Sequence, residues 1–119
     1  MVINNIISDK SKRFALRGIK LYKYLVTEKR EYVLSKQILR SSTSIGANIR
    51  EALHAQSKPV FYSKLNIALK EADETAYWLE LLHESDYLSE KHFLSIYNDC
   101  EELVKLLVSI TKTQKETMP

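Results

Sequence analysis

The sequence is poor in the residues that interrupt secondary structure and in those that cross-link it. Its 119 residues include only two glycines and two prolines, fewer than the turns of a many-stranded protein need. A single cysteine, Cys100, excludes an internal disulfide and favours a reducing compartment. No stretch approaches the ~18–20 apolar residues of a membrane span, and the N-terminal apolar run is too short for a signal peptide. We therefore expect a cytoplasmic protein that does not associate with a membrane.

Amphipathic helical patterning runs through almost the whole chain. Apolar residues recur at steps of three and four, which predicts helices over residues 9–28, 32–56, 59–84 and 89–112. Ser8 or Asp9 can cap the first helix. Pro59 suits the first turn of the third helix, and Ser89 can cap the fourth. Helices of about 20–25 residues joined by short turns predict an all-α, antiparallel up-down-up-down four-helix bundle, a single domain over residues 1–119.

One stretch of the second helix, RSSTSIGANIREA from Arg40 to Ala52, is built mostly from small polar residues. Ile45 and Ile49 lie one turn apart and are expected to face the core. Gly46 lies on one side of this face, and small polar side chains flank the other: Ser41, Ser44 and Asn48. Such residues each cost several tenths to about 1 kcal/mol relative to Ala in a helix interior. This cost indicates a use for small side chains, and we expect a neighbouring helix to approach closely here.

Two Glu-x-x-His motifs, Glu51–His54 and Glu80–His83, match part of the ligand set of di-iron helical bundles. Because the second and third helices are antiparallel, the two motifs should lie near opposite ends of the bundle, ~35 Å apart. The first helix also has no acid in its interior to supply a further ligand. We therefore expect no metal site and no cofactor.

The sequence offers no catalytic group of residues either. It has no Cys–His spacing for zinc and no glycine-rich phosphate loop. The hydroxyl residues at 41–44 have no base within helical reach, and Cys100 falls on the inner stripe of its helix, where a packed thiol is expected. We therefore expect that the protein is not an enzyme.

Positive charge is concentrated in the first half of the chain. Residues 1–50 carry 11 Lys and Arg against 3 Asp and Glu, whereas residues 51–119 carry 7 against 12. Basic residues form one row on the first helix and one on the second: Lys10, Arg13, Arg17 and Lys20, then Lys36, Arg40 and Arg50. If both rows share one surface, that surface suits the phosphate backbone of a nucleic acid. The alternative is an ordinary solvated face, partly neutralised by the acidic half of another subunit.

The third helix has a second apolar row on its far side: Val60, Ile67, Trp78 and Leu81. Glu71 and Glu74 interrupt this row. A tryptophan and three aliphatic residues at helical spacing predict a contact surface for self-association. The alternative is a tryptophan half-covered by its own neighbours.

Three segments closely resemble the "four helix bundle protein" family, also called the 23S rRNA intervening-sequence protein or S23 family: SKRFALRGIKLYKYL (11–25), LRSSTSIGANIREA (39–52) and FYSKLNIALKEADETAYWLELL (61–82). The resemblance covers nearly the whole chain and implies a small four-helix bundle that assembles as a homopentamer. Members are often encoded inside intervening sequences of large-subunit ribosomal RNA genes. A related branch, the accessory variability proteins of diversity-generating retroelements, comprises basic pentamers that engage nucleic acid and a reverse transcriptase. The family is not known for catalysis.

Two hypotheses follow for the function. The first is a non-catalytic homo-oligomer that binds RNA or DNA through a basic surface of its first two helices. The second is a protein-interaction scaffold, in which the charge asymmetry serves assembly and the partner is another protein.

Overall fold

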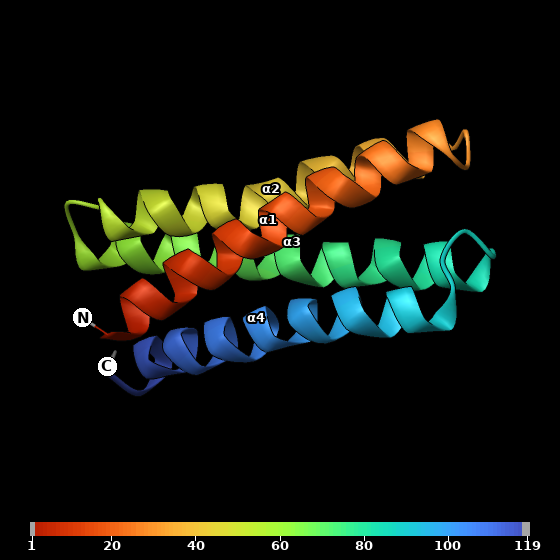
Figure 1. Ribbon diagram of the computed structural model, residues 1–119. Helices are drawn as coiled ribbons and strands as arrows, with labels where there is room; N and C mark the ends of the chain where they lie inside the picture. Colours follow the sequence, from red (N-terminus) through yellow and green to blue (C-terminus); the bar gives the residue numbers. More distant parts are fainter. Residues whose placement is uncertain (1, 118–119) are drawn as a thin grey trace.

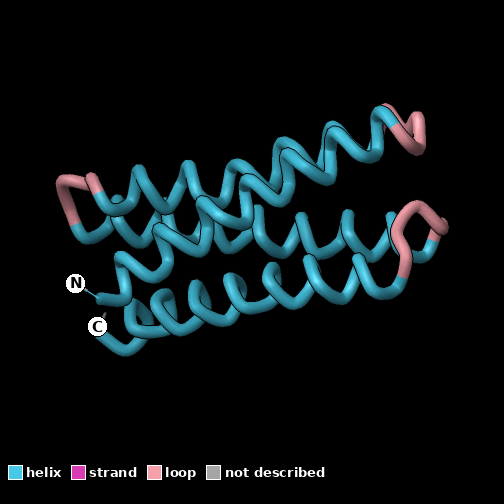
Figure 2. Tube along the Cα trace, in the orientation of Figure 1, coloured by secondary structure: helices cyan, strands magenta, loops and turns pink. Residues whose placement is uncertain are grey.

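The computed structural model describes residues 2–117, which form four α-helices joined by short turns (Figure 1). The helices are α1 (Val2–Thr27), α2 (Leu34–Leu53), α3 (Lys58–Glu84) and α4 (Glu90–Thr117). Successive helices run in opposite directions, with the turns at the two ends of an elongated bundle of 49 × 23 × 21 Å (Figures 1 and 2). The all-α, up-down-up-down four-helix bundle predicted from the sequence is therefore confirmed.

The helix boundaries differ from the predicted ones mainly at the two ends of the chain. α1 begins at Val2 instead of residue 9, so Ser8 and Asp9 lie inside the helix and do not cap it. The extra turns form because Ile7 continues the apolar spacing and is buried in the core. α4 continues to Thr117 instead of ending at residue 112. α2 is shorter than predicted, Leu34–Leu53 against 32–56, whereas α3 agrees within one residue.

Serine side chains cap the starts of α3 and α4; the cap at Ser89 was predicted from the sequence, and the cap at Ser57 was not. Ser57 precedes α3, and its Oγ accepts a hydrogen bond from the N–H of Val60 (3.3 Å), with Pro59 in the first turn. The Oγ of Ser89 accepts from the N–H of His92 (3.2 Å). Both caps satisfy backbone donors that the first turn of a helix leaves without an internal partner.

A buried carboxylate caps α2, which the sequence did not reveal. The Oε atoms of Glu31 accept hydrogen bonds from the N–H groups of Val33, Leu34 and Ser35, at 3.2, 2.9 and 2.7 Å. Burial alone would raise the pKa of Glu31. The backbone hydrogen bonds outweigh burial, and the pKa lies below its usual value of 4.5. The charged α1–α2 turn therefore holds the start of α2 in place.

Small residues bring α2 very close to both of its neighbours. A Cβ atom added to Gly18 of α1 would lie 1.9 Å from the Oγ of Ser42, so only glycine fits there without a shift. On the other side of α2, the hydroxyls of Ser41 and Thr75 of α3 are hydrogen-bonded at 2.8 Å. The predicted close approach of a helix at the small-residue segment is confirmed, and it occurs on two sides.

Two small polar residues of the same segment do not contact a neighbouring helix through a hydrogen bond. The Oγ of Ser44 donates to the carbonyl of Arg40 (2.6 Å), and the amide of Asn48 donates to the carbonyl of Ser44 (2.9 Å). Both side chains thus satisfy themselves on their own helix, as hydroxyl and amide groups in helices often do.

α1 crosses the bundle obliquely. Its first turns lie near the end of α4, whereas its last turn lies beside the start of α2 and away from the α3–α4 turn (Figure 1). α1 and α4 therefore diverge toward the end of the bundle that holds the α1–α2 turn. This divergence decides what surrounds the basic residues of α1.

A candidate nucleic-acid interface

The basic row of α1 faces α4 instead of sharing a surface with α2. The Nζ of Lys10 lies 3.1 Å from the Oε1 of Glu102, and the Nη1 of Arg17 lies 2.6 Å from the Oδ2 of Asp99. Arg17 also donates to the carbonyl and to the hydroxyl of Ser95, at 3.2 and 3.0 Å. Two of the four cations in this row are therefore paired with acids of α4.

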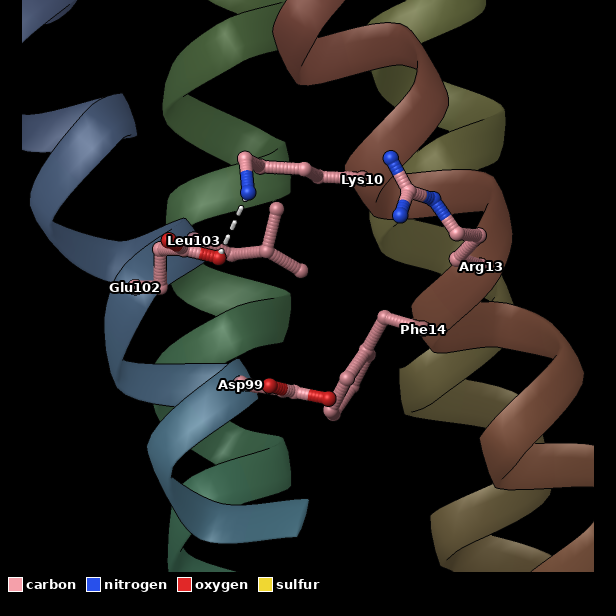
Figure 3. A pocket seen from close by; sticks show the side chains of 6 residues that line it. All are labelled: Lys10, Arg13, Phe14, Asp99, Glu102 and Leu103. Carbon is pink, nitrogen blue, oxygen red and sulfur yellow. Dashed lines mark hydrogen bonds and ion pairs between the residues drawn. The ribbon is translucent and has the colours of Figure 1, made fainter. Parts of the chain in front are cut away.

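Arg13 belongs to the same row but has no acid partner among the described residues. It lines a small pocket of about 110 Å³ between α1 and α4, together with Asp99 and Glu102. Figure 3 shows a dashed line from Lys10 to Glu102 and none from Arg13 to either carboxylate. Lys20, the last cation of the row, is exposed and likewise unpaired in the described part of the chain.

Arg40 of α2 points toward α3, away from the basic row of α1. Its guanidinium donates to the Oε2 of Glu71 at 2.9 Å and also to Glu74. The hydrogen bond to Glu74, helped by the charge of Glu71, raises the pKa of Arg40 above its already high value. The structure therefore places three of the seven predicted cations, Lys10, Arg17 and Arg40, in ion pairs within the chain.

The remaining cations of α2, Lys36 and Arg50, are exposed and have no acid partner among the described residues. Arg50 lies at the edge of a groove of about 440 Å³ between α1 and α2. We call this the α1–α2 groove; it is lined by Ser8, Ser11, Lys12 and Ala15 of α1 and by Thr43, Gly46, Ala47, Arg50 and Glu51 of α2. The surface is hollow here because Gly46 has no side chain and the methyl groups of Ala15 and Ala47 are too short to fill the space.

Lys12 is the cation that sequence reasoning missed. It lies in the α1–α2 groove with Arg50, on the opposite side of α1 from Lys10 and Arg17. Two residues further along a helix mean a rotation of about 200°, so Lys10 and Lys12 cannot face the same neighbour. The signal that finds Lys12 is its spacing from Ser8 and Ala15, which share its side of the helix.

A second groove opens where α1 and α4 diverge. We call this the α1–α4 groove; it has a volume of about 200 Å³ and is lined by Arg17, Lys20, Leu21 and Tyr24 of α1, by Leu88 of the α3–α4 turn, and by His92 and Ile96 of α4. Leu88 and Ile96 are buried parts of the core, and Tyr24 packs against that core. The groove thus has an apolar floor and a basic rim.

The apolar row of α3 is only partly exposed. Val60 and Ile67 expose 45% and 39% of their surface, whereas Trp78 and Leu81 are half-buried. The indole N–H of Trp78 donates to Glu74 (3.1 Å), the same carboxylate that binds Arg40. The acids beside this row are therefore already engaged within the chain.

Glu80 and His83 of the second Glu-x-x-His motif have structural partners. Among the described residues, no three His, Cys, Asp or Glu side chains are grouped so that they could hold a metal ion. His83 stacks on Phe93 with ring centroids 4.2 Å apart, and Glu80 accepts a hydrogen bond from the hydroxyl of Tyr97 (3.0 Å). Burial, with that hydrogen bond, raises the pKa of Tyr97 to about 12.

Cys100 is a packed thiol, as its place on the inner stripe predicted. It is fully buried, and its Sγ lies 3.3 Å from the carbonyl oxygen of Ala72. Burial raises the pKa of this thiol to about 12, so the reactive thiolate is strongly disfavoured.

Across the described chain, no helix contains an apolar stretch long enough to span a bilayer.

Comparisons with known proteins agree with this architecture. Residues 4–109 match the model of the family described as 23S rRNA-intervening sequence protein. The chain is also similar to a solved structure from Bacteroides thetaiotaomicron, a protein of unknown function from the S23 ribosomal protein family, with 59% identity and a TM-score of 0.91 over 92% of this chain and 98% of that chain. None of the curated proteins matches. The resemblance seen in the sequence is thereby confirmed: the chain belongs to the 23S rRNA-intervening sequence protein family.

Proposed function

We propose that the protein is a non-catalytic homo-oligomer, a pentamer, that binds nucleic acid through the basic residues of α1 and α2. The observation that carries the proposal is a set of exposed cations on these two helices with no acid partner in the described part of the chain: Lys12, Arg13, Lys20, Lys36 and Arg50. Unpaired cations are free to meet phosphates, because no internal ion pair must first be broken. RNA is the first ligand to test, given the family's description as 23S rRNA-intervening sequence proteins.

The expected binding is electrostatic and largely independent of sequence. Each phosphate that a cation neutralises releases condensed counterions, so affinity falls with salt with a slope of about −0.9 per contact for a duplex and about −0.7 for a single strand. In the part of the chain that the structure describes, no known base-reading motif accompanies these cations. Weak, salt-sensitive association with many RNA sequences is therefore the expected behaviour.

A charge reversal with a matched control tests this surface. Lys36→Glu with Arg50→Glu should weaken binding of a labelled ribosomal RNA fragment about tenfold at low salt and reduce the salt slope by about 2. Lys70→Glu with Lys105→Glu changes the net charge equally, at exposed positions of α3 and α4, and should leave affinity nearly unchanged. Fluorescence anisotropy across a salt series measures both quantities. Equal weakening by the two pairs would show that only net charge matters, and unchanged affinity in the first pair would refute the proposal.

For self-association we propose the α3 surface of Val60, Ile67, Trp78 and Leu81. What supports it is the combination of exposed aliphatic side chains with two acids, Glu71 and Glu74, that are each already paired with Arg40. A second subunit can then cover the surface without burying an unpaired charge, which would be strongly unfavourable. The interface would thus be apolar with a satisfied polar centre, as stable interfaces are.

Light scattering tests the assembly. The wild-type protein should have five times the mass of the 13.8 kDa chain, and Ile67→Asp should reduce it toward the monomer. Leu94→Asp is the control, because Leu94 is similarly exposed but lies on α4. A wild-type mass of 13.8 kDa would refute self-association, and a smaller assembly would refute the pentamer alone.

The second candidate is a protein-interaction scaffold without a nucleic-acid role. The observation in its favour is that Lys10, Arg17 and Arg40 are used inside the chain, which leaves fewer cations for a polyanion. It predicts a defined oligomer with no RNA affinity above background at low salt. The two measurements above separate it from the leading proposal.

A further inference from the structure

We infer that the α1–α4 groove receives an unpaired base of a single-stranded nucleic acid, while the flanking phosphates meet cations of α1. The inference rests on the proposed nucleic-acid binding and adds to it the kind of strand. It also gives the α4 side of α1 a role separate from that of the α1–α2 groove.

The shape of the groove follows from the crossing of α1. Leu21 and Tyr24 lie on the last turns of α1, where this helix has moved away from α4 (Figure 1). Leu88 and Ile96 are too deep in the core to fill the space between the helices. The result is an apolar hollow of about 200 Å³ that opens to solvent on one side.

The side chains of the groove combine an aromatic ring with positive charge. Tyr24 packs against the core, so its position is restrained, and its ring lines the groove. Lys20 lies one turn before it, exposed and without an acid partner among the described residues. Arg17 lies on the same rim, and no acidic residue lines the groove. A base stacked on an aromatic ring with cations beside it is the usual recognition mode for single strands.

A strand suits this surface better than an acidic peptide does, because the positive charge continues beyond the groove. Arg13 lies one turn before Arg17 on the same side of α1; like Lys20 it has no acid partner among the described residues, and it shares a pocket with Asp99 and Glu102, which are paired with Arg17 and Lys10. The cations from Arg13 to Lys20 span about 10 Å along the helix. A track of charge beside one apolar hollow fits a phosphate chain with one inserted base. A duplex keeps its bases stacked and paired, so they cannot enter the hollow.

Fluorescence anisotropy with two RNA probes at low salt tests the inference. The probes are a single strand of about 12 nucleotides, within the range of known single-strand sites, and a blunt-ended duplex of two separate strands of similar length, which has no unpaired loop. Tyr24→Leu should weaken binding of the single strand about tenfold, which is within the range for the loss of one stacked base. Binding of the duplex should not change. Tyr24→Phe should retain single-strand affinity, because phenylalanine stacks as well.

Two controls keep the result interpretable. Tyr77→Leu makes the same change at an exposed tyrosine of α3 and should have no effect on either probe. Lys20→Gln changes an exposed side chain that the fold does not need, so it should weaken single-strand binding even if Tyr24→Leu unfolds the protein. Circular dichroism of each variant identifies any loss of structure.

The outcomes separate the two proposals. If Lys36→Glu with Arg50→Glu weakens both probes while Tyr24→Leu and Lys20→Gln weaken neither, the groove inference fails and the proposed function stands. If the wild-type protein binds neither probe at low salt, the proposed function fails as well. If an acidic amphipathic peptide binds and Tyr24→Leu abolishes that binding but not RNA binding, the groove serves a protein partner and the inference is overturned.

Discussion

The two sides of α1 are built in opposite ways. Toward α2 the helix carries small residues, and Gly18 lies so close to Ser42 that a Cβ atom would not fit. Toward α4 it carries long charged side chains, and Lys10 and Arg17 reach across to acids of the other helix. One side is held by close packing of helices, and the other by ion pairs across a wider gap.

Because of this difference, we expect the contact at Gly18 to contribute mainly to folding stability and the α4 side of α1 to be available for ligand binding. Close packing excludes water and ligand, so the contact of α1 with α2 at Gly18 and Ser42 mainly stabilises the fold, whereas the α1–α2 groove elsewhere between these helices stays open. Partly exposed ion pairs contribute little stability but leave polar groups that can exchange partners. The apolar hollow near Tyr24 opens only on the loosely packed side. We therefore expect substitutions at the close contact between Gly18 and Ser42 to affect folding, and those on the α4 side of α1 to affect binding.

The largest expected effect is at Gly18. Gly18→Ala should destabilise the protein by about 2 kcal/mol, because overpacking typically costs 1–3 kcal/mol and outweighs the better helix propensity of alanine. Urea unfolding followed by circular dichroism measures the change. Gly46→Ala is the matched control: its new Cβ would lie 3.4 Å from Ser11, an ordinary contact, so stability should stay the same or increase.

A double variant tests the cause assigned to that loss. Both close atoms near Gly18 belong to the side chain of Ser42, its Oγ and its Cβ. Combining Gly18→Ala with Ser42→Gly should therefore recover part of the lost stability, although glycine is itself unfavourable in a helix. If the losses in free energy of unfolding caused by Gly18→Ala and by Ser42→Gly simply add in the double variant, the steric explanation is wrong.

The sequence was sufficient to predict the helices and the core but not the neighbours of each polar side chain. Spacing of three and four places Ile45, Ile49 and Cys100 inside, because the rotation of 100° per residue fixes their angle to the core stripe. The same rotation places Lys10 and Lys12 on opposite flanks of α1. Periodicity alone does not tell which flank meets α2 and which meets α4, since both hands of the bundle give the same pattern.

The oblique crossing of α1 and the side-chain cap of α2 could not be predicted from the sequence either. The groove near Tyr24 exists because α1 diverges from α4, and that divergence depends on the packing of whole helices around Gly18. The sequence does not reveal the cap at Glu31, because a carboxylate that folds back onto the next helix has no distinct spacing. Ser89 was predictable because it directly precedes the predicted start of its helix, whereas Ser57 lies two residues before residue 59, where the third helix was predicted to begin.

The next largest effect on stability is expected at Glu31, in the α1–α2 turn. Glu31→Gln should cost about 1 kcal/mol at neutral pH, because a neutral amide accepts hydrogen bonds from the start of α2 less strongly than a carboxylate does. The lowered pKa means that this contribution is present above the usual value of 4.5 and is lost as the pH falls through the folded-state pKa. Thermal unfolding at several pH values should show the two proteins converging in acid. A difference that persists at low pH would contradict the role of the charge.

A substitution in the α3–α4 turn should stabilise the protein, in contrast to Glu31→Gln, which should destabilise it. Asp86 has a positive φ of 68° and ends α3 in a Schellman motif, in which the N–H of Tyr87 donates to the carbonyl of Leu82 at 2.9 Å. Glycine adopts this conformation without the steric penalty, so Asp86→Gly should stabilise the protein by about 0.5–1 kcal/mol. Thermal unfolding measures the gain. The control is Asp86→Ala, which removes the carboxylate but keeps the Cβ and should not stabilise.

The smallest expected effect is on the α4 side of α1. Lys10→Gln with Arg17→Gln removes both ion pairs between α1 and α4, and the loss should be below about 1 kcal/mol because all four side chains are partly exposed. Most of the difference should disappear in about 1 M salt, where such charges are screened. Lys12→Gln, at an unpaired cation, is the control and should not change urea unfolding.

The size of this effect bears directly on the groove near Tyr24. An Arg17 that is held weakly by Asp99 can exchange that carboxylate for a phosphate with little loss of folding stability. A loss of about 3 kcal/mol or more that survived high salt would mean that the pair is a structural requirement, since partly exposed pairs do not reach that value. Arg17 would then be unavailable to a ligand, and single-strand binding would depend on Lys20 and Arg13 alone. The same result would contradict the proposed difference between the two sides of α1, because both sides would then mainly stabilise the fold.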